Sequence, residues 1–258
     1  MNDEVISEIN RNFIYQLAEK GKRLDNRAPD EYRPIKVEKG VIATAEGSAR
    51  IHIGKTDVLV GVKLGLGEPF PDTPNKGVLT TNVELVPLAS PTFESGPPKG
   101  DAIELARVVD RGIRESGTLD LEKLCLEEGK KVWIMFIDMH VLDYEGNLFD
   151  ASAMGALAAL TNTTVPASRF EVGEDFKLPI MHYPIACTTI KVENTLLVDP
   201  ALEEERIAKA RLTVTTDENG DVRAMQKGLN GSFTMEEVKK IITSSQAIAK
   251  ENRKNIME

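Results

Sequence analysis

The stretch GSARIHIGKTDVLVGV, residues 47–62, decides the fold of this chain. Two apolar runs rich in β-branched residues are separated by Gly54, Lys55 and Thr56, a spacing that is typical of a β-hairpin. We therefore expect strands over residues 47–53 and 57–66, joined by a tight turn. The β-structure of the chain begins with this antiparallel pair.

Helices and further strands surround the hairpin. An amphipathic pattern predicts a helix over residues 3–20, which Gly21 is placed to end. Asp101 is expected to cap the next long helix, with Glu104 at its third position. The nearly continuous apolar run KVWIMFIDMHV predicts a strand that is buried on both faces. The elements expected after the hairpin are a strand at 79–88, a helix at 101–116, a short helix at 119–126, a strand at 131–141 and a close-packed helix at 151–160.

The second half of the chain repeats the order of strands followed by a helix. The proline-containing segment 166–184 is expected to link two lobes, which gives an N-terminal lobe at 1–185 and a C-terminal lobe at 186–258. The final helix starts near Thr234. The strands expected before it are 185–192, 195–198, 210–216 and 222–227. This order is compatible with a duplicated α+β unit.

Composition is ordinary for a globular protein, with an acidic balance. The 258 residues include 41 acidic and 32 basic side chains, giving a formal charge of −9. This balance argues against a protein that coats nucleic acid with its whole surface, but it does not exclude a local basic patch. No apolar run is long enough to span a bilayer, and no export signal is recognised, so we expect a cytoplasmic protein without membrane contact. Cys125 and Cys187 are expected to be buried thiols.

A stripe of arginines stands out on this acidic background. Arg107, Arg111 and Arg114 follow one another at i, i+4 and i+7, within about 60° of one helix face. Guanidinium groups suit phosphate oxygens, so the stripe points to a polyphosphate strand as partner. The alternative is an ordinary solvated face, whose arginines pair with Glu104, Asp110 and Glu115. The spacing alone leaves both interpretations open.

Common nucleotide-binding, hydrolase and metal-binding motifs are missing from the sequence. The chain contains no P-loop, no dinucleotide fingerprint and no G-x-S-x-G motif. Its histidines, His52, His140 and His182, have no second ligand at a metal-binding spacing. Asp138 and Asp143 are interpreted as structural hydrogen-bond acceptors. We therefore expect neither a cofactor nor a metal site, and an unrelated small-molecule enzyme on a similar scaffold is disfavoured.

Four motifs in order resemble the RNase PH family of phosphorolytic RNases. They are KRLDNRAPDEYR at 22–33, with an R-x-D-x-R pattern, the hairpin at 47–62, the arginine stripe, and WIMFIDMHVLDYEGNLFDAS at 133–152. The resemblance covers residues 20 to 250. Within the family, the chain is most similar to the non-catalytic RNase PH-like subunit of the archaeal exosome core.

This resemblance implies an α+β fold with a duplicated β-α unit (ribosomal protein S5 domain 2-like), in which mixed sheets pack with helices. It implies a ring of three heterodimers with a catalytic RNase PH-like subunit, closed by RNA-binding cap subunits, with single-stranded RNA in a central channel. The expected RNA-binding residues are Arg107, Arg111, Arg114 and Lys76, the last in a loop that the family places near the channel entrance. Whether Arg23 and Arg27 also touch RNA is left open.

The chain departs from the active members of that family at two places. Asn147-Leu148-Phe149-Asp150 stands where the family has a Gly-Thr-Arg-Thr-like turn that holds phosphate. Glu205 stands at the first of two acidic positions, and Arg211 stands at or near the second. We therefore expect no catalytic residue and a structural, RNA-binding role that completes a partner's active site.

Two alternatives stay open at this point. The chain could itself be a phosphate-dependent 3′-to-5′ exoribonuclease, with Glu204, Glu205 or Asp199 in the catalytic role. The same acidic residues also suit an ordinary helix start, with Asp199 as N-cap, Pro200 at the first position and glutamates in the first turn.

Overall fold

The computed structural model describes residues 8–257 of the chain. Helix α1 spans Glu8–Glu19, so residues 3–7 of the helix expected at 3–20 lie outside the described part. Gly21, in the left-handed region with φ +65°, follows the helix as expected. Ile14 and Ala18 of α1 are buried against the C-terminal half of the chain. Among the described residues, no helix is long and apolar enough to cross a bilayer.

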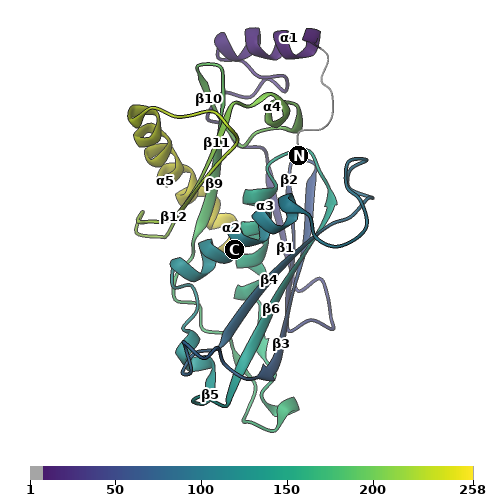
Figure 1. Ribbon diagram of the computed structural model, residues 1–258, viewed down its shortest axis with the longest axis vertical. Helices are drawn as coiled ribbons and strands as arrows, with labels where there is room; N and C mark the ends of the chain where they lie inside the picture. Colours follow the sequence, from purple (N-terminus) through teal and green to yellow (C-terminus); the bar gives the residue numbers. More distant parts are fainter. Residues whose placement is uncertain (1–7, 258) are drawn as a thin grey trace.

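The predicted hairpin is the centre of a first, mixed sheet. β2 (Gly47–Ile53) and β3 (Thr56–Gly67) pair antiparallel, with Ile53 opposite Thr56. Gly54 occupies the turn with φ +60°, a conformation that glycine adopts without strain. The strand order is β1-β2-β3-β6-β4, in which β1 is Ile35–Lys39, β6 is Lys131–Asp143 and β4 is Val78–Leu85. Only β4 runs parallel to its neighbour β6 within this sheet (Figure 1).

Strand β6 corrects one prediction. Its side chains alternate between the core and the outer face, so the strand is buried on one face and not on both. Met135, Ile137 and Met139 are fully buried, whereas Phe136 on the opposite face is 37% exposed. Trp133 is in the core as expected.

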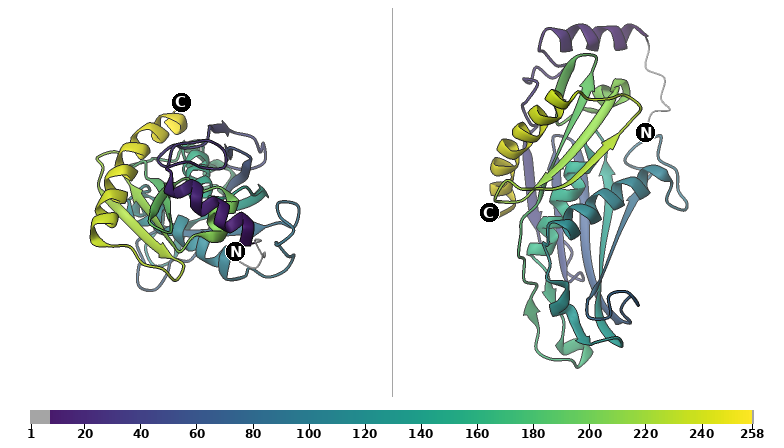
Figure 2. Two further views of the ribbon diagram at one scale, coloured as in Figure 1. Left: turned by 90° about the horizontal axis from the view of Figure 1, so that it is seen from above. Right: turned by 60° about the vertical axis from the view of Figure 1, so that its left-hand side comes forward.

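A second sheet follows in the order β10-β9-β11-β12, and all its pairs are antiparallel. Its strands are β9 (Ile185–Val192), β10 (Thr195–Val198), β11 (Ala210–Thr216) and β12 (Val222–Gly228). Two helices accompany it, the short α4 (Leu202–Ile207) and the long C-terminal α5 (Met235–Met257). Figure 2 shows α5 along the outer side of this sheet.

Helix α3 (Leu148–Thr161) joins the two halves. It contacts β2 and β3 of the first sheet and β9 of the second, and nearly all its residues are buried. The close-packed helix predicted at 151–160 is thereby confirmed, with three further residues at its start. The main hydrophobic core includes Ile185, Cys187 and Ala249 beside the side chains of the first sheet. Because both sheets share this core, the lobe boundary after residue 185 stays a prediction.

Two local expectations were wrong. Residues 119–126 form a 3-10 turn (Leu121–Leu124) followed by the short strand β5 (Cys125–Glu127), where a single helix was expected. Helix α2 spans Gly100–Glu115, so Lys99 is its N-cap and Asp101 lies inside the first turn. The segment 166–184, expected as a linker, contains a 3-10 turn at Ser168–Phe170 and the short strand β8 (Phe176–Lys177), which pairs antiparallel with β7 (Thr164–Val165) just before the segment.

Candidate nucleic-acid interface

The predicted arginine stripe lies on α2, which crosses the molecule beside β4 and contacts β12 of the second sheet (Figure 1). The buried side of α2 consists of Ala102, Leu105, Val108, Val109, Gly112 and Ile113. Ile103 does not belong to this side and is 46% exposed. Arg107 and Arg114 are exposed and Arg111 is half-buried, so the three guanidinium groups lie outside the core. We call these three residues the arginine face.

The three arginines have different partners. Arg107 makes no hydrogen bond or ion pair within residues 8–257. Arg111 Nη1 donates to Gln226 Oε1 of β12 at 3.0 Å, a neutral acceptor that leaves the positive charge uncompensated. Arg114 Nη2 lies 2.8 Å from Asp110 Oδ1 and also donates to the carbonyl of Leu79. The pairing expected for a solvated face is thus confirmed for Arg114 with Asp110 alone.

Lys76 lies in the loop before β4 and is 43% exposed. Its Nζ is 3.8 Å from Glu122 Oε1, a long contact between two exposed side chains. Arg114 reaches the carbonyl of Leu79, three residues after Lys76. The loop therefore places Lys76 on the Arg114 side of the arginine face.

The segment in the place of the family's phosphate turn is filled by the chain itself. Asn147 adopts a left-handed conformation with φ 57°, and its backbone N–H donates to Glu205 Oε1 at 2.8 Å. Phe149 is 1% exposed, and the Arg211 guanidinium carbon lies 4.0 Å from the centre of its ring. A carboxylate therefore already accepts from the backbone at the start of α3, where a helix N-terminus would otherwise attract an anion.

The residues at the two positions where the family has acidic side chains, Glu205 and Arg211, also make contacts within the chain. Glu205 is half-buried, accepts a hydrogen bond from the Tyr144 hydroxyl at 2.7 Å, and its removal from solvent raises its pKa. Arg211 is 7% exposed, and its Nη2 lies 2.6 Å from Glu104 Oε1 of α2. Its Nε atom has no hydrogen-bond partner within the described part of the chain. Arg211 also lies close enough to Glu205 for its positive charge to lower the pKa of that carboxyl group, although loss of solvent raises the pKa more.

The structure contains a second cluster of arginines, which the sequence analysis did not predict. Arg23, Arg27 and Arg33 come from the R-x-D-x-R segment and its continuation, and all are buried. Arg23 Nε donates to Glu204 Oε1 at 2.9 Å. Arg27 and Arg33 both donate to the Asp199 carboxylate, at 2.9 and 2.8 Å. We call these three residues the buried arginine cluster, and their burial removes Arg23 and Arg27 as RNA contacts.

Asp199 has a different role from the one considered. The helix cap is Ala201, while Asp199 is fully buried in the left-handed region with φ 46°. Burial alone raises its pKa, but the hydrogen bonds and charge of Arg33, with Asn147, outweigh burial and lower the pKa. The glutamates expected in the first turn, Glu203 to Glu205, are present in α4.

Asp150, like Asp199, is a fully buried carboxyl group of this region. It accepts hydrogen bonds from the Tyr32 hydroxyl, from Asn147 Nδ2 at 2.8 Å, and from the Thr188 backbone N–H and hydroxyl at 2.9 and 2.7 Å. Burial raises its pKa to about 6 despite these donors. The segment expected to replace the family's phosphate turn is thus part of a buried hydrogen-bond network.

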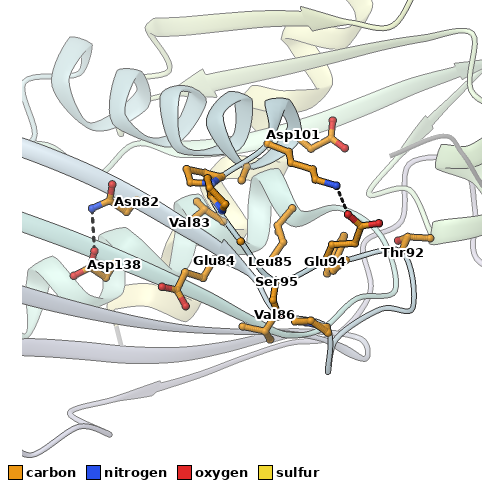
Figure 3. A pocket seen from close by; sticks show the side chains of 17 residues that line it. Asn82, Val83, Glu84, Leu85, Val86, Thr92, Glu94, Ser95, Asp101 and Asp138 are labelled. Carbon is orange, nitrogen blue, oxygen red and sulfur yellow. Dashed lines mark hydrogen bonds and ion pairs between the residues drawn. The ribbon is translucent and has the colours of Figure 1, made fainter.

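A cavity of about 530 Å³ lies between the end of β4, the loop after it and the start of α2. Figure 3 shows its polar lining, in which Asn82 bonds Asp138, and Glu94 pairs with Lys99. Glu84 and Asp101 add further carboxylates, so the cavity is acidic and unsuited to a phosphate chain.

The remaining titratable groups have structural partners. Each histidine lies within 4 Å of a carboxylate: His52 of Asp57, His140 of Glu84 and His182 of Glu218. Within residues 8–257, no group of three or more His, Cys, Asp or Glu side chains could hold a metal ion. Asp138 and Asp143 accept hydrogen bonds as expected. Cys187 is buried, whereas Cys125 is only half-buried.

Two family descriptions match this chain in sequence. The 3′ exoribonuclease family, domain 1 (RNase PH), matches residues 31–166, and domain 2 of the same family matches residues 182–248. The chain belongs to the RNase PH family. The resemblance inferred from its motifs is confirmed, and so is the expected α+β fold of that family.

Relatives and solved structures agree with this assignment. The chain is 57% identical to the exosome complex component Rrp42 of Methanocella arvoryzae, over 94% of this chain and 93% of the relative. It is 55% identical to Rrp42 of Thermoplasma acidophilum, over 97% and 96% of the two chains. A chain of the Archaeoglobus fulgidus exosome with RNA bound to the active site superposes with a TM-score of 0.93 at 49% identity, covering 96% and 97%. An archaeal exosome core chain gives a TM-score of 0.90 at 45% identity, covering 97% of both chains.

Proposed function

We propose that this chain is a non-catalytic, RNA-binding subunit of an archaeal exosome core, which pairs with a catalytic RNase PH-like subunit in phosphorolytic 3′-to-5′ RNA degradation. Its high identity to Rrp42 relatives over the full length supports membership of such a core. In this proposal three heterodimers form a ring, RNA-binding cap subunits close it, and single-stranded RNA is the substrate. The complex acts in the cytoplasm.

The observation that carries the non-catalytic role is the occupied start of α3. Glu205 takes the backbone N–H of Asn147, and Phe149 stacks with Arg211 where phosphate would have to lie. An incoming phosphate would meet two carboxyl groups, the half-buried Glu205 and the buried Asp150, and would have to displace internal hydrogen bonds. Phosphorolysis needs phosphate held beside the RNA end, so this chain lacks the place for its nucleophile.

The catalytic alternative finds little support in the three acidic candidates. Glu204 is paired with Arg23, and Asp199 with Arg27 and Arg33. Glu205 accepts hydrogen bonds from the Tyr144 hydroxyl and the Asn147 backbone N–H. A carboxylate that positions a metal ion or transfers a proton must reach the substrate, and none of these three is free to do so.

The RNA-binding role rests on the arginine face and Lys76. Arg107 is exposed without a partner among the described residues, and Arg111 keeps its full charge beside a neutral amide. Phosphate contacts by such groups add affinity without sequence preference. Pairing with a catalytic chain would bring this face to the partner's active site, which explains how a chain without its own chemistry contributes to the reaction.

The test compares the isolated chain, a catalytic RNase PH-like partner, and the two together on 5′-labelled single-stranded RNA with inorganic phosphate. We expect no release of nucleoside diphosphates from the isolated chain and processive shortening by the pair. Phosphate-dependent shortening by this chain alone would refute the non-catalytic role. An assembled pair no faster than the partner alone would refute the proposed completion of its site.

A further inference from the structure

Arg211 occupies a position where a catalytic carboxylate was expected, and it links β11 to α2. From this link we infer that Arg211 is a positioning residue, which holds α2 through Glu104 and so fixes the direction in which the arginine face meets RNA. The inference rests on the proposed function, since it assigns a role within the same RNA-binding face. It assigns a role to Arg211, which stands at or near a position where an acidic residue is expected from the family.

The surroundings of Arg211 are built for its guanidinium group. One face of the group lies 4.0 Å from the ring of Phe149, an attractive cation–π arrangement. Gly228 of β12 lies against it, and a Cβ atom at Gly228 would be only 2.5 Å from Arg211 Nη2. A glycine and an aromatic ring thus enclose the side chain and direct Nη2 toward Glu104 Oε1 at 2.6 Å.

The link reaches the helix on the side that carries the arginine face. Glu104 precedes Arg107 by three residues and Arg111 by seven, so all three lie along neighbouring turns of one side of α2. A second link on this side is the hydrogen bond from Arg111 to Gln226. Directly after Arg111, a Cβ atom at Gly112 would lie 3.6 Å from Thr215 of β11, so the helix also approaches that strand closely. The second sheet therefore holds α2 at more than one point.

The ion pair between Arg211 and Glu104 is less exposed to solvent than an ordinary surface ion pair. Arg211 is 7% exposed and Glu104 is partly buried, so the pair is only weakly screened by solvent. Glu205 is close enough for the charge of Arg211 to lower its pKa, although burial raises that pKa more. Loss of the guanidinium would release Glu104 and leave the N-terminal half of α2 without its polar tie to β11.

The test uses the assembled ring with its catalytic partner. Arg211→Met keeps an unbranched apolar chain against Phe149 but removes the charge, and Glu104→Gln removes the charge at the other end. The matched control is Lys191→Met, which breaks the 2.7 Å ion pair between Lys191 of β9 and Glu237 of α5 without touching α2. Steady-state phosphorolysis gives KM for RNA and kcat, thermal unfolding gives Tm, and hydrogen exchange reports on residues 100–115.

We expect Arg211→Met and Glu104→Gln each to raise KM for RNA about three- to tenfold with kcat nearly unchanged. The double variant should be no worse than the worse single variant, because both remove the same link. Exchange should rise in the N-terminal half of α2. Lys191→Met should lower Tm by a similar amount and leave KM unchanged.

Two results would overturn the inference. One is an Arg211→Met ring with lower Tm but unchanged KM, which would make the residue structural only. The other is a double variant whose losses add, which would mean that the residues act separately. Arg111→Gln measured in the same ring separates this failure from failure of the proposed function: if Arg111→Gln has no effect on KM, the RNA face itself is wrong, whereas an effect of Arg111→Gln without one of Arg211→Met refutes the positioning role alone.

Discussion

The buried arginine cluster and the arginine face use the same residue type for opposite purposes. Arg23, Arg27 and Arg33 are at most 8% exposed, and each donates to the carboxylate of Asp199 or Glu204. On α2, Arg107 is exposed without a partner among residues 8–257, and Arg111 binds only a neutral amide. In the buried arginine cluster, internal carboxylates balance the positive charges. On the arginine face, the charges of Arg107 and Arg111 are not balanced in this way and are available to a ligand.

The difference teaches that pairing, and not residue type, separates a structural arginine from a binding one. A buried ion pair that loses one partner is left with an uncompensated charge, which is costly. An exposed, unpaired guanidinium can be removed with little effect on stability, but its loss removes a phosphate contact. Substitutions in the two groups should therefore change different measured quantities.

The largest effect is expected from Arg33→Met. This change removes the bidentate partner of Asp199 and leaves Arg27 to balance a buried carboxylate alone. We expect the free energy of unfolding to fall by about 3–5 kcal/mol, measured by urea titration of the isolated chain. The control Lys36→Met, which breaks an exposed pair with Glu38 near the same segment, should leave the midpoint unchanged. A loss for Arg33→Met no larger than the control's would show that the buried cluster is not structural.

A somewhat smaller effect is expected from the pH dependence of Asp150. Burial raises its pKa from the ordinary 3.8 to about 6, so between these values the folded state binds more protons than the unfolded state. The stability contributed by this group is fully present below 3.8 and is lost as pH rises through about 6, by about 3 kcal/mol in total. The difference in unfolding free energy between the wild type and Asp150→Asn, measured by urea titration at pH 4 to 7.5, should therefore fall with rising pH.

The contribution of Asp199 to stability changes with pH in the opposite direction and in a different pH range. Its pKa is lowered, so its contribution is present above 3.8 and is lost as pH falls through the folded pKa. Titration from pH 4 upward thus isolates Asp150 from the arginine-paired carboxylate. A difference that stays flat from pH 4 to 7.5 would mean that Asp150 is not the proton-binding group of this network.

The sequence predicted the fold well where the signal was local. The hairpin turn at Gly54, the apolar strand β6 and the Asn219-Gly220 turn between β11 and β12 follow from patterns within a few residues. Errors arose where neighbours decide the outcome. The outer face of β6 was expected in the core because an apolar run does not reveal that no helix covers its second side. Asp101 resembles a cap, but the helix begins one residue earlier.

The site was predicted in part, for the same reason. The spacing of Arg107, Arg111 and Arg114 showed a shared helix face, and the family motif located Asn147–Asp150 as a departure. Neither could show that Glu205 would cap Asn147 or that Arg211 would bind Glu104, because these pairs are 58 and 107 residues apart in sequence. The clustering of Arg23, Arg27 and Arg33 with Asp199 and Glu204 is a long-range effect of the same kind. A signal was present, since each arginine needs an acidic partner if buried, but sequence spacing does not identify it.

The most direct measurement is the salt dependence of RNA binding by the assembled ring with Arg107→Gln and Arg111→Gln. Each phosphate contact to single-stranded RNA contributes about 0.7 to the slope of log Kd against log salt concentration. We predict that the double variant lowers this slope by about 1 to 1.5 and weakens binding about tenfold or more at 0.1 M salt, while Tm is unchanged. A slope equal to that of the wild-type ring would contradict the account, since the arginine face would then not contact phosphate.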